Sequence, residues 1–203
     1  MLLEEKIKFL KENVEPIYDE ICGNGYRASV YLKDGTYLPC VRFRNPDHKT
    51  NQAIKRLDEE RKGKSIFSST SGHGYKEIVE LFVTTGNRIS EFDIARIELS
   101  PYAFSKEILS QIRGETSMGW TGFCAKMTDG KVFGFGTSFS FDFFQMPDGY
   151  TAKDVIEIIN HSYYAKDGTI KKHKIGSTMQ RADYNAELIN LSRPFFDCYL
   201  KGL

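Results

Sequence analysis

The feature that most constrains this chain is an Asp-Gly pair, Asp34-Gly35, between two runs in which apolar and polar residues alternate. Asp-Gly suits a tight hairpin turn and alternation is the period of a half-buried strand, so residues 29–33 and 37–43 are predicted to pair as a β-hairpin. Before this hairpin, apolar residues recur every three or four positions from Leu3 to Ile21, which predicts a helix that kinks or restarts at Pro16. A helix followed by a hairpin is the expected start of the fold.

The same order recurs further along the chain. Residues 105–112 are predicted to form a helix, and an alternating run from Phe123 then leads to a second Asp-Gly pair, Asp129-Gly130. Gly25-Tyr26, before the first turn, has a counterpart in Gly119-Trp120, before the second. Matched landmarks in one order favour an internal duplication over a chance resemblance.

Each hairpin is followed by a segment that we expect to be helical and then by a strand. Helices are predicted over residues 77–82 and 154–159, each after a Gly-Tyr pair, and strands over residues 94–99 and 170–175. The spacing between the copies shrinks downstream because the first copy carries an insertion, residues 45–72. The predicted unit is therefore helix, β-hairpin, helix, strand, present twice.

The predicted fold class is α+β: an antiparallel sheet with covering helices, built from two copies of this unit, plus a C-terminal helix. Residues 1–203 are expected to form a single compact domain of two pseudo-repeats, the first over 1–101, the second over 102–177, with a C-terminal helical segment over 178–203. An alternative interpretation takes residues 94–175 as a ferredoxin-like core of strand, helix, hairpin, helix and strand, with extensions on both sides.

Charge and composition exclude several classes of protein. The 28 Lys and Arg residues are balanced by 27 Asp and Glu, so no global positive field is available to hold nucleic acid or an anionic membrane. No apolar run approaches the roughly 18 residues that a membrane-spanning helix needs, and the first residues lack the basic-then-apolar order of a signal peptide. We therefore expect a cytoplasmic protein without membrane contact.

The four cysteines and four histidines are scattered along the chain. No C-x-x-C, H-x-H or H-E-x-x-H spacing occurs, so the sequence predicts neither a metal site nor a disulfide framework, and buried reduced thiols are the expected state. Residues 23–28 have the letters of a dinucleotide fingerprint, but they run from a helix into a strand, which is the reverse of that motif. No cofactor is predicted.

The sharpest local pattern lies between Val132 and Phe143, where Phe recurs at 133, 135, 139, 141 and 143. Period two would place every Phe on one buried face of a strand and Gly, Ser and Asp on the other. The small-residue face would let another backbone or a flat ligand approach closely.

The candidate binding residues lie mainly in and around the insertion. Its flanks are basic, and a Ser- and Gly-rich loop follows, which is typical of a mobile binding segment. Trp120, the only tryptophan, is either a core anchor or a platform on which a base could stack beside basic groups. The candidate binding residues are therefore Arg42, Arg44, Lys55, Arg56, His73 and Trp120, and no catalytic residue or metal ligand is assigned.

The leading functional hypothesis is a non-catalytic cytoplasmic binding or interaction protein of the immunity-protein or accessory-subunit type, with a protein partner. A duplicated unit presents two similar faces with a cleft between them, which suits binding. The alternative is a nucleic-acid-binding or nucleic-acid-processing protein that uses the basic insertion, whose binding would weaken steeply as salt rises. A third class is an enzyme whose acidic groups converge only in the fold, with His73 or Glu98 as participants. Because no assembled catalytic signature is present, an enzyme is the less favoured class.

Overall fold

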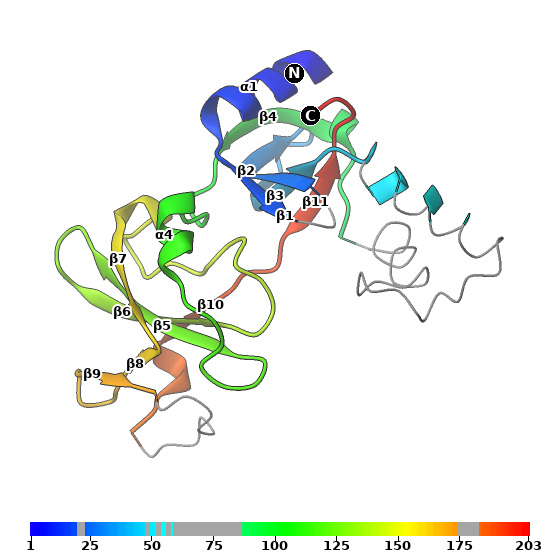
Figure 1. The fold of residues 1–203 in the computed structure, drawn as a ribbon. Coiled ribbons are helices and arrows are strands. Elements are labelled where there is room, and N and C mark those ends of the chain that lie inside the picture. Colours follow the sequence, from blue (N-terminus) through cyan, green and yellow to red (C-terminus); the bar gives the residue numbers. More distant parts are fainter. Residues whose placement is uncertain (20–22, 48, 52–53, 56–57, 59–86, 174–182) are drawn as a thin grey trace.

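The described chain is mainly β: two larger sheets lie next to each other and a two-stranded sheet lies at one end (Figure 1). The computed structural model describes residues 1–19, 23–47, 49–51, 54–55, 58, 87–173 and 183–203. Helices within these ranges are few and short, so the predicted helix-covered α+β class is wrong. The apolar segments are rich in β-branched and aromatic residues, and such residues favour strands once neighbouring strands are available to pair with.

The first sheet has the order β1-β2-β3-β11, and β4 pairs with the other side of β2. Its strands are β1 (Pro16–Asp19), β2 (Gly23–Leu32), β3 (Tyr37–Arg44), β4 (Ile94–Leu99) and β11 (Phe196–Tyr199). The helix α1 (Leu3–Asn13) belongs to this half, and its Leu10 is fully buried in one core with Val41 and Phe43. The predicted helix ends well before Ile21, because Val14 is already extended and Pro16 begins β1.

The second sheet has the order β10-β6-β5-β7. Its strands are β5 (Thr121–Met127), β6 (Val132–Thr137), β7 (Val155–Asn160) and β10 (Ile189–Leu191). The helix α4 (Lys106–Gln111) begins where the Ser105 hydroxyl accepts the Ile108 N–H at 3.2 Å, which is an N-cap. A second, Phe-rich core forms between α4 and this sheet.

The two sheets follow one topology. In each, the first hairpin strand pairs antiparallel with a later strand (β4 or β7), and the second hairpin strand pairs parallel with a C-terminal strand (β11 or β10). A short 3-10 helix, η2 (Glu91–Asp93) or η3 (Ala152–Asp154), precedes the later strand in each case. The turns close alike, since Leu32 N–H donates to the Thr36 carbonyl and Met127 N–H to the Lys131 carbonyl, both at 2.8 Å. The predicted hairpins are confirmed; duplication as their origin stays a prediction.

A third hairpin closes with the same bonds. It consists of β8 (Ser162–Tyr164) and β9 (Ile170–Lys172), with Asp167-Gly168 at its turn. Ala165 N–H donates to the Thr169 carbonyl at 2.9 Å, as Leu32 and Met127 do in their turns. Each of these turns also has a neighbouring N–H bonded to an aspartate carbonyl from a later segment, Asp93, Asp154 or Asp183.

Residues 154–159 do not form the predicted helix. Val155–Asn160 is strand β7, paired antiparallel with β5. Four of its six residues are Val or Ile, whose branched side chains lose rotamer freedom in a helix but pack well on a pleated sheet. The equivalent prediction for residues 77–82 lies outside the described residues. The predicted strand at 94–99 is confirmed as β4, and the one at 170–175 is described as β9 over its first three residues.

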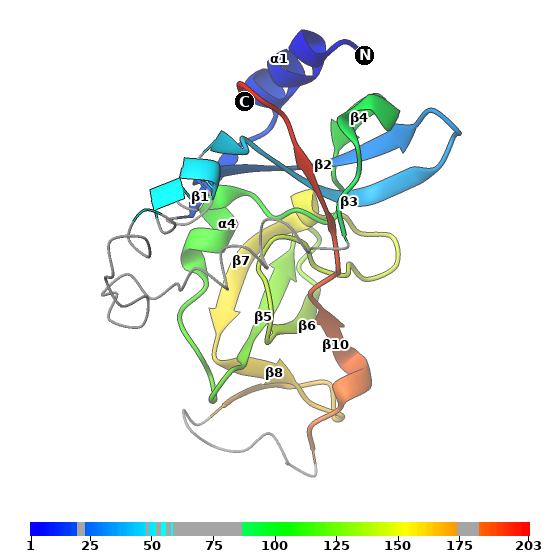
Figure 2. The same cartoon turned by 90° about the vertical axis from the view of Figure 1, so that its right-hand side faces the viewer.

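The predicted C-terminal helix over 178–203 is also wrong in its described part, residues 183–203. This part holds a 3-10 turn, η4 (Ala186–Leu188), and the strands β10 and β11, which join different sheets (Figure 2). Pro194 lies between these strands and is incompatible with a helix interior, because it lacks an N–H and clashes with the preceding turn. The ferredoxin-like alternative over 94–175 is wrong for a related reason, since β4 belongs to the first sheet and β7 to the second.

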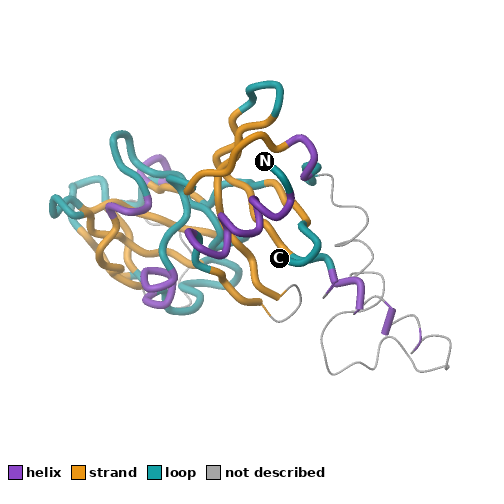
Figure 3. The backbone as a smooth tube through the Cα atoms, turned by 90° about the horizontal axis from the view of Figure 1, so that it is seen from above, coloured by secondary structure: helices purple, strands orange, loops and turns teal. Residues whose placement is uncertain are grey.

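The predicted single face of buried Phe residues holds only within β6 and after residue 142. Phe135 and Phe143 are buried, whereas Phe139 is 75% exposed and Phe141 is 42% exposed. The strand ends at Thr137, whose hydroxyl oxygen accepts the N–H groups of Phe139 and Ser140 at 3.0 Å. This turn breaks the alternation, and residues 138–142 become a loop from which Asp142 reaches Arg42 of the first sheet. Seen from above, the described backbone is mainly strand and loop (Figure 3).

Candidate functional site

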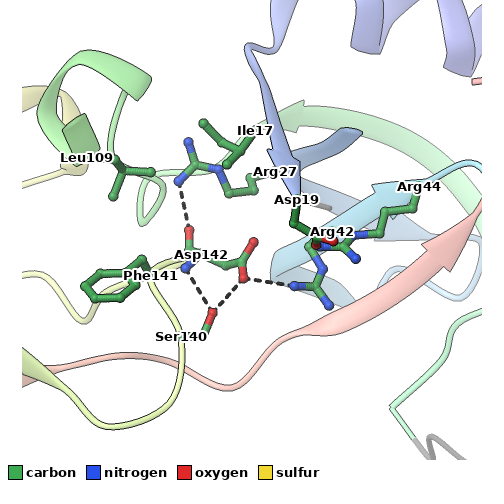
Figure 4. A pocket seen from close by; sticks show the side chains of 9 residues that line it. All are labelled: Ile17, Asp19, Arg27, Arg42, Arg44, Leu109, Ser140, Phe141 and Asp142. Carbon is green, nitrogen blue, oxygen red and sulfur yellow. Dashed lines mark hydrogen bonds and ion pairs between the residues drawn. The ribbon is translucent and has the colours of Figure 1, made fainter. Parts of the chain in front are cut away.

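A pocket of about 260 Å³ lies where the two sheets meet (Figure 4). The first sheet contributes residues of β1, β2 and β3, and the second half contributes α4 and the loop that follows β6. Its lining combines charged, polar and apolar side chains: Ile17, Asp19, Arg27, Arg42, Arg44, Leu109, Ser140, Phe141 and Asp142.

The three arginines reach the pocket because they share one face of the first sheet. Arg42 and Arg44 are two apart on β3, and Arg27 is the register partner of Arg42 on β2. Residues opposite each other in an antiparallel pair project to the same side, so all three side chains leave the face that does not hold the apolar core.

A β-bulge determines this face. The β2–β3 register shifts between Ala28 and Val30, so Leu38 packs against the first core while Val41 and Phe43, three and five residues later, also face it. Without the shift, Arg42 would share a face with Leu38 and would point into that core. The bulge therefore places Arg42 and Arg44 in the pocket.

Arg42 is the centre of an ion-pair network that joins the two halves. Its Nε and Nη2 donate to the two carboxylate oxygens of Asp197 at 2.9 and 3.2 Å, and its Nη1 donates to Asp142 Oδ2 at 2.9 Å. The guanidinium also lies over the Phe195 ring, 4.3 Å from its centroid. Ser140 Oγ donates to the same Asp142 oxygen at 2.6 Å. The bidentate pair joins β3 to β11 within the first sheet, and the bond to Asp142 is the charged contact that Arg42 makes with the other half, where both side chains are under 20% exposed.

Arg27 is held differently. Its residue is only 5% exposed, and its Nη1 and Nη2 donate to the backbone carbonyls of Asp142 at 3.1 Å and Phe104 at 2.6 Å. Among the described residues its Nε has no hydrogen-bond partner. Burial lowers the pKa of this guanidinium from its usual value, against the attraction of the Asp142 and Glu15 charges. A positive charge is thus held here chiefly by dipoles and by charges at a distance.

Arg44 lies across β2 because Gly25, its register partner, has no side chain. A Cβ on Gly25 would lie 3.3 Å from Arg44 Nε and 3.5 Å from the Arg42 side chain. Arg44 Nη2 pairs with Asp19, and its Nε has no hydrogen-bond partner within the described ranges. The glycine therefore leaves room for two long cationic side chains to lie flat on the sheet.

The apolar wall completes the pocket. Ile17 and Leu109 are partly exposed at its edge, and Phe141 is 42% exposed beside it. Figure 4 shows Leu109 and Phe141 on the side opposite Arg42 and Arg44. A ligand bound here would meet guanidinium groups at one end and aliphatic or aromatic carbon at the other.

The structure brings together two of the six candidate binding residues, Arg42 and Arg44. Lys55 is exposed on the insertion, whose described residues 47, 49–51, 54–55 and 58 are helical, while Arg56 and His73 lie outside the described residues. The nucleic-acid alternative stays a prediction, and Lys55 does not line the pocket that holds the two arginines. Sequence reasoning missed Arg27, because counting back from the Asp-Gly turn without the bulge would pair it with Val41.

Trp120 lies in the second half, away from the pocket. Its indole covers the glycine face of the β5–β6 hairpin, where a Cβ on Gly136 would lie 2.1 Å from Cζ2 and a Cβ on Gly122 would lie 2.9 Å from Nε1. The close approach predicted for the small-residue face is therefore made by the chain's own tryptophan.

The other candidate chemistries find no support in the parts of the chain that the structure describes. No group of three or more His, Cys, Asp or Glu side chains there has an arrangement that could hold a metal ion. Glu98 lies on β4 and pairs with Arg96 at 3.1 Å, and it does not line the pocket. Cys40, Cys124 and Cys198 are free and buried, and burial raises the pKa of Cys40 to about 11 and of Cys198 to about 12, which makes these thiols unreactive at neutral pH.

Comparison with known proteins gives no relative from which a function could be transferred: no family model, no curated protein and no solved structure matches this chain. Within the described residues, the helices are all too short or too polar to cross a membrane.

Proposed function

We propose that this chain is a binding protein and that its ligand enters the pocket between the two sheets. The observation that carries the proposal is the pocket itself, which is built from both halves and lined by three arginines, Arg27, Arg42 and Arg44, together with apolar side chains. Concave sites at the junction of two structural units, with apolar walls and a few convergent polar groups, are the usual form of a ligand site.

The size of the pocket limits what it can hold. Its volume of about 260 Å³ lies just below the ~300–1,000 Å³ range of most small-molecule sites. A dinucleotide or a stretch of nucleic acid exceeds this space, whereas a compact organic molecule or one terminal group of a larger partner fits it. The proposal therefore includes the predicted protein partner only if such a partner inserts a single group here.

The test compares two Leu→Trp variants of the full chain. Leu109→Trp places an indole at the pocket wall, and Leu99→Trp makes the same change on β4, where Leu99 is 42% exposed and does not line the pocket. Both proteins are screened by ligand-observed NMR against a library of small organic acids, amines and neutral compounds. We expect a set of compounds that bind the wild type and Leu99→Trp but not Leu109→Trp. If no compound distinguishes the two variants, the pocket is not a binding site.

A further inference from the structure

We propose that the ligand of this pocket is a small carboxylate with one negative charge and an apolar body. The inference rests on the proposed function and names the ligand class of that site. It follows from three properties of the lining: the donors that remain on the arginines, the charge balance around them, and the position of the apolar wall.

The donors come first. A guanidinium has five N–H groups, and Arg27 uses one on each of two backbone carbonyls. The hydrogen bond that Arg44 makes within the described chain joins its Nη2 to Asp19. Both residues line the pocket and both are 5% exposed, and the buried Nε of each has no hydrogen-bond partner among the described residues. Carboxylates and phosphates match this planar fork, whereas neutral groups do not use its charge.

The charge balance then selects among anions. Arg42 is already neutralised by Asp197 and by Asp142, and Arg44 by Asp19. Arg27, bonded to carbonyls, is the cation whose charge is least compensated by direct contact. The three arginines and these three aspartates balance in number, but no carboxylate contacts Arg27 directly, so one added negative charge can pair with Arg27. A second negative charge would have no further cation to pair with and would face Asp142 and Asp19. A like charge about 4 Å away costs roughly three orders of magnitude in affinity at an effective dielectric constant of about 20. This argues against a phosphate monoester and for a monoanion.

The apolar wall indicates the chemistry of the rest of the ligand. Ile17, Leu109 and Phe141 line the same pocket as the arginines, so an anion bound to Arg27 would have its remaining atoms against hydrocarbon. Burial of apolar surface is favourable in proportion to area, and a half-exposed aromatic ring such as Phe141 gains contact when a flat ligand covers it. A bare inorganic anion would leave this wall uncovered.

The experiment uses three probes of one shape: benzoate, the neutral benzamide, and phenylphosphonate at a pH where it is a dianion. Binding to the full-length protein is measured by titration calorimetry and by the shifts of the arginine Nε–Hε NMR signals. We expect benzoate to bind at least tenfold more tightly than either analogue. Benzamide lacks the negative charge that would pair with Arg27, and the phenylphosphonate dianion adds a second charge that would face Asp142 and Asp19. The Nε–Hε signals of Arg27 and Arg44 should shift with benzoate.

Two variants distinguish a role of Arg27 in binding benzoate from a role in folding. Arg27→Met should weaken benzoate at least tenfold, and Arg96→Met, which removes an exposed arginine on β4, should leave the affinity unchanged. Should Arg27→Met fail to fold, the Nε–Hε shifts in the wild type decide the matter, since benzoate that binds elsewhere leaves the Arg27 signal in place.

A failure of the monoanion assignment gives results different from a failure of the proposed function. If benzamide or phenylphosphonate binds as tightly as benzoate and all are lost in Leu109→Trp, the pocket binds ligands but the monoanion assignment is wrong. The same holds if the library compounds excluded by Leu109→Trp are neutral or cationic. If Leu109→Trp excludes no compound at all, the proposed function is wrong and this inference falls with it.

Discussion

The register pair Arg27–Arg42 in the first sheet occupies the same place as Gly122–Gly136 in the second. In each sheet it lies one step beyond a pair of core-facing residues, Ala28–Val41 or Phe123–Phe135. The strand pairing is shared apart from the extra residue in β3, but the chemistry of the face differs, with two long cations in one sheet and no side chains in the other.

This difference determines how each face is covered. The glycines let Trp120 lie directly on the second sheet, and β8 packs over the same region, since Tyr164 Cβ would lie 3.6 Å from a Cβ on Gly134. The arginines instead meet carboxylates, among them Asp142 from the opposite half, and leave a pocket between them. Two units with one topology thus differ in how one face is covered: packing closes it in the second sheet, and in the first sheet it lines a pocket.

The largest loss of stability is expected from adding a side chain to the glycine face of the second sheet. In Gly136→Ala the new Cβ would overlap Trp120 Cζ2, so the indole must leave its position. We expect a loss of about 2–3 kcal/mol in unfolding free energy and a shift of tryptophan emission to longer wavelength, measured by urea titration. Gly114→Ala is the control, because a Cβ there meets nothing within 4 Å. Unchanged emission in Gly136→Ala would show that the indole does not cover the sheet.

A smaller loss of stability is expected from a change at the face of the first sheet that holds Arg27, Arg42 and Arg44. Asp142→Asn keeps the shape of the side chain but removes the charge that Arg42 Nη1 and Ser140 Oγ contact. The side chain is 18% exposed, so we expect a loss of about 2 kcal/mol by denaturant titration.

The matched control for this variant is Glu157→Gln. Glu157 lies 3.9 Å from Lys126 and both side chains are more than 40% exposed, so the change should stay within about 0.5 kcal/mol. Equal effects of the two substitutions would mean that the Arg42 network does not hold the halves together.

The smallest effect concerns the three turn aspartates. The pKa of Asp34, Asp129 and Asp167 is lowered, first by the Thr36 N–H, the Tyr150 hydroxyl and the Thr169 hydroxyl respectively, and that of Asp167 falls to about 2. Because the folded state then binds protons less readily than the unfolded chain, the stabilisation is complete above the ordinary aspartate pKa of about 3.9 and is lost as pH falls towards 2. Carboxyl ¹³C titration should give Asp167 the lowest midpoint of the three; a midpoint near 4 would contradict the turn bonds.

Local patterns predicted the elements whose partners are close in sequence. The Asp-Gly turns, with strands on both sides of each, follow from the glycine, which adopts a positive φ of 89° at Gly35 and 87° at Gly130. The start of α4 follows from Ser105 ahead of an apolar stripe. The wrong predictions concern segments whose pairing strand is distant in the sequence. Residues 154–159 have apolar spacing that fits a helix, and only pairing with β5 makes them a strand; residues 189–191 and 196–199 become strands by joining β6 and β3.

The candidate site was predicted only in part for the same reason. Arg42 and Arg44 were selected for the positive charge of a segment, yet the structure uses them inside an interface and not on an open basic surface. Arg27 carries no local signal, because its place beside Arg42 depends on one extra residue in β3. Asp142 and Asp197 are distant in sequence from the arginines that they neutralise.

The sequence by itself determined the hairpins, the first helix and the glycine positions on which an indole can lie, since turn chemistry, helical periodicity and the absence of a side chain act within a few residues. Tertiary structure alone decided which face Arg27, Arg42 and Arg44 occupy and what lies opposite them. A single-residue shift in strand register inverts every side chain beyond it, and the free energy that favours one register comes from burying the Leu38, Val41 and Phe43 side chains in a core assembled from distant segments.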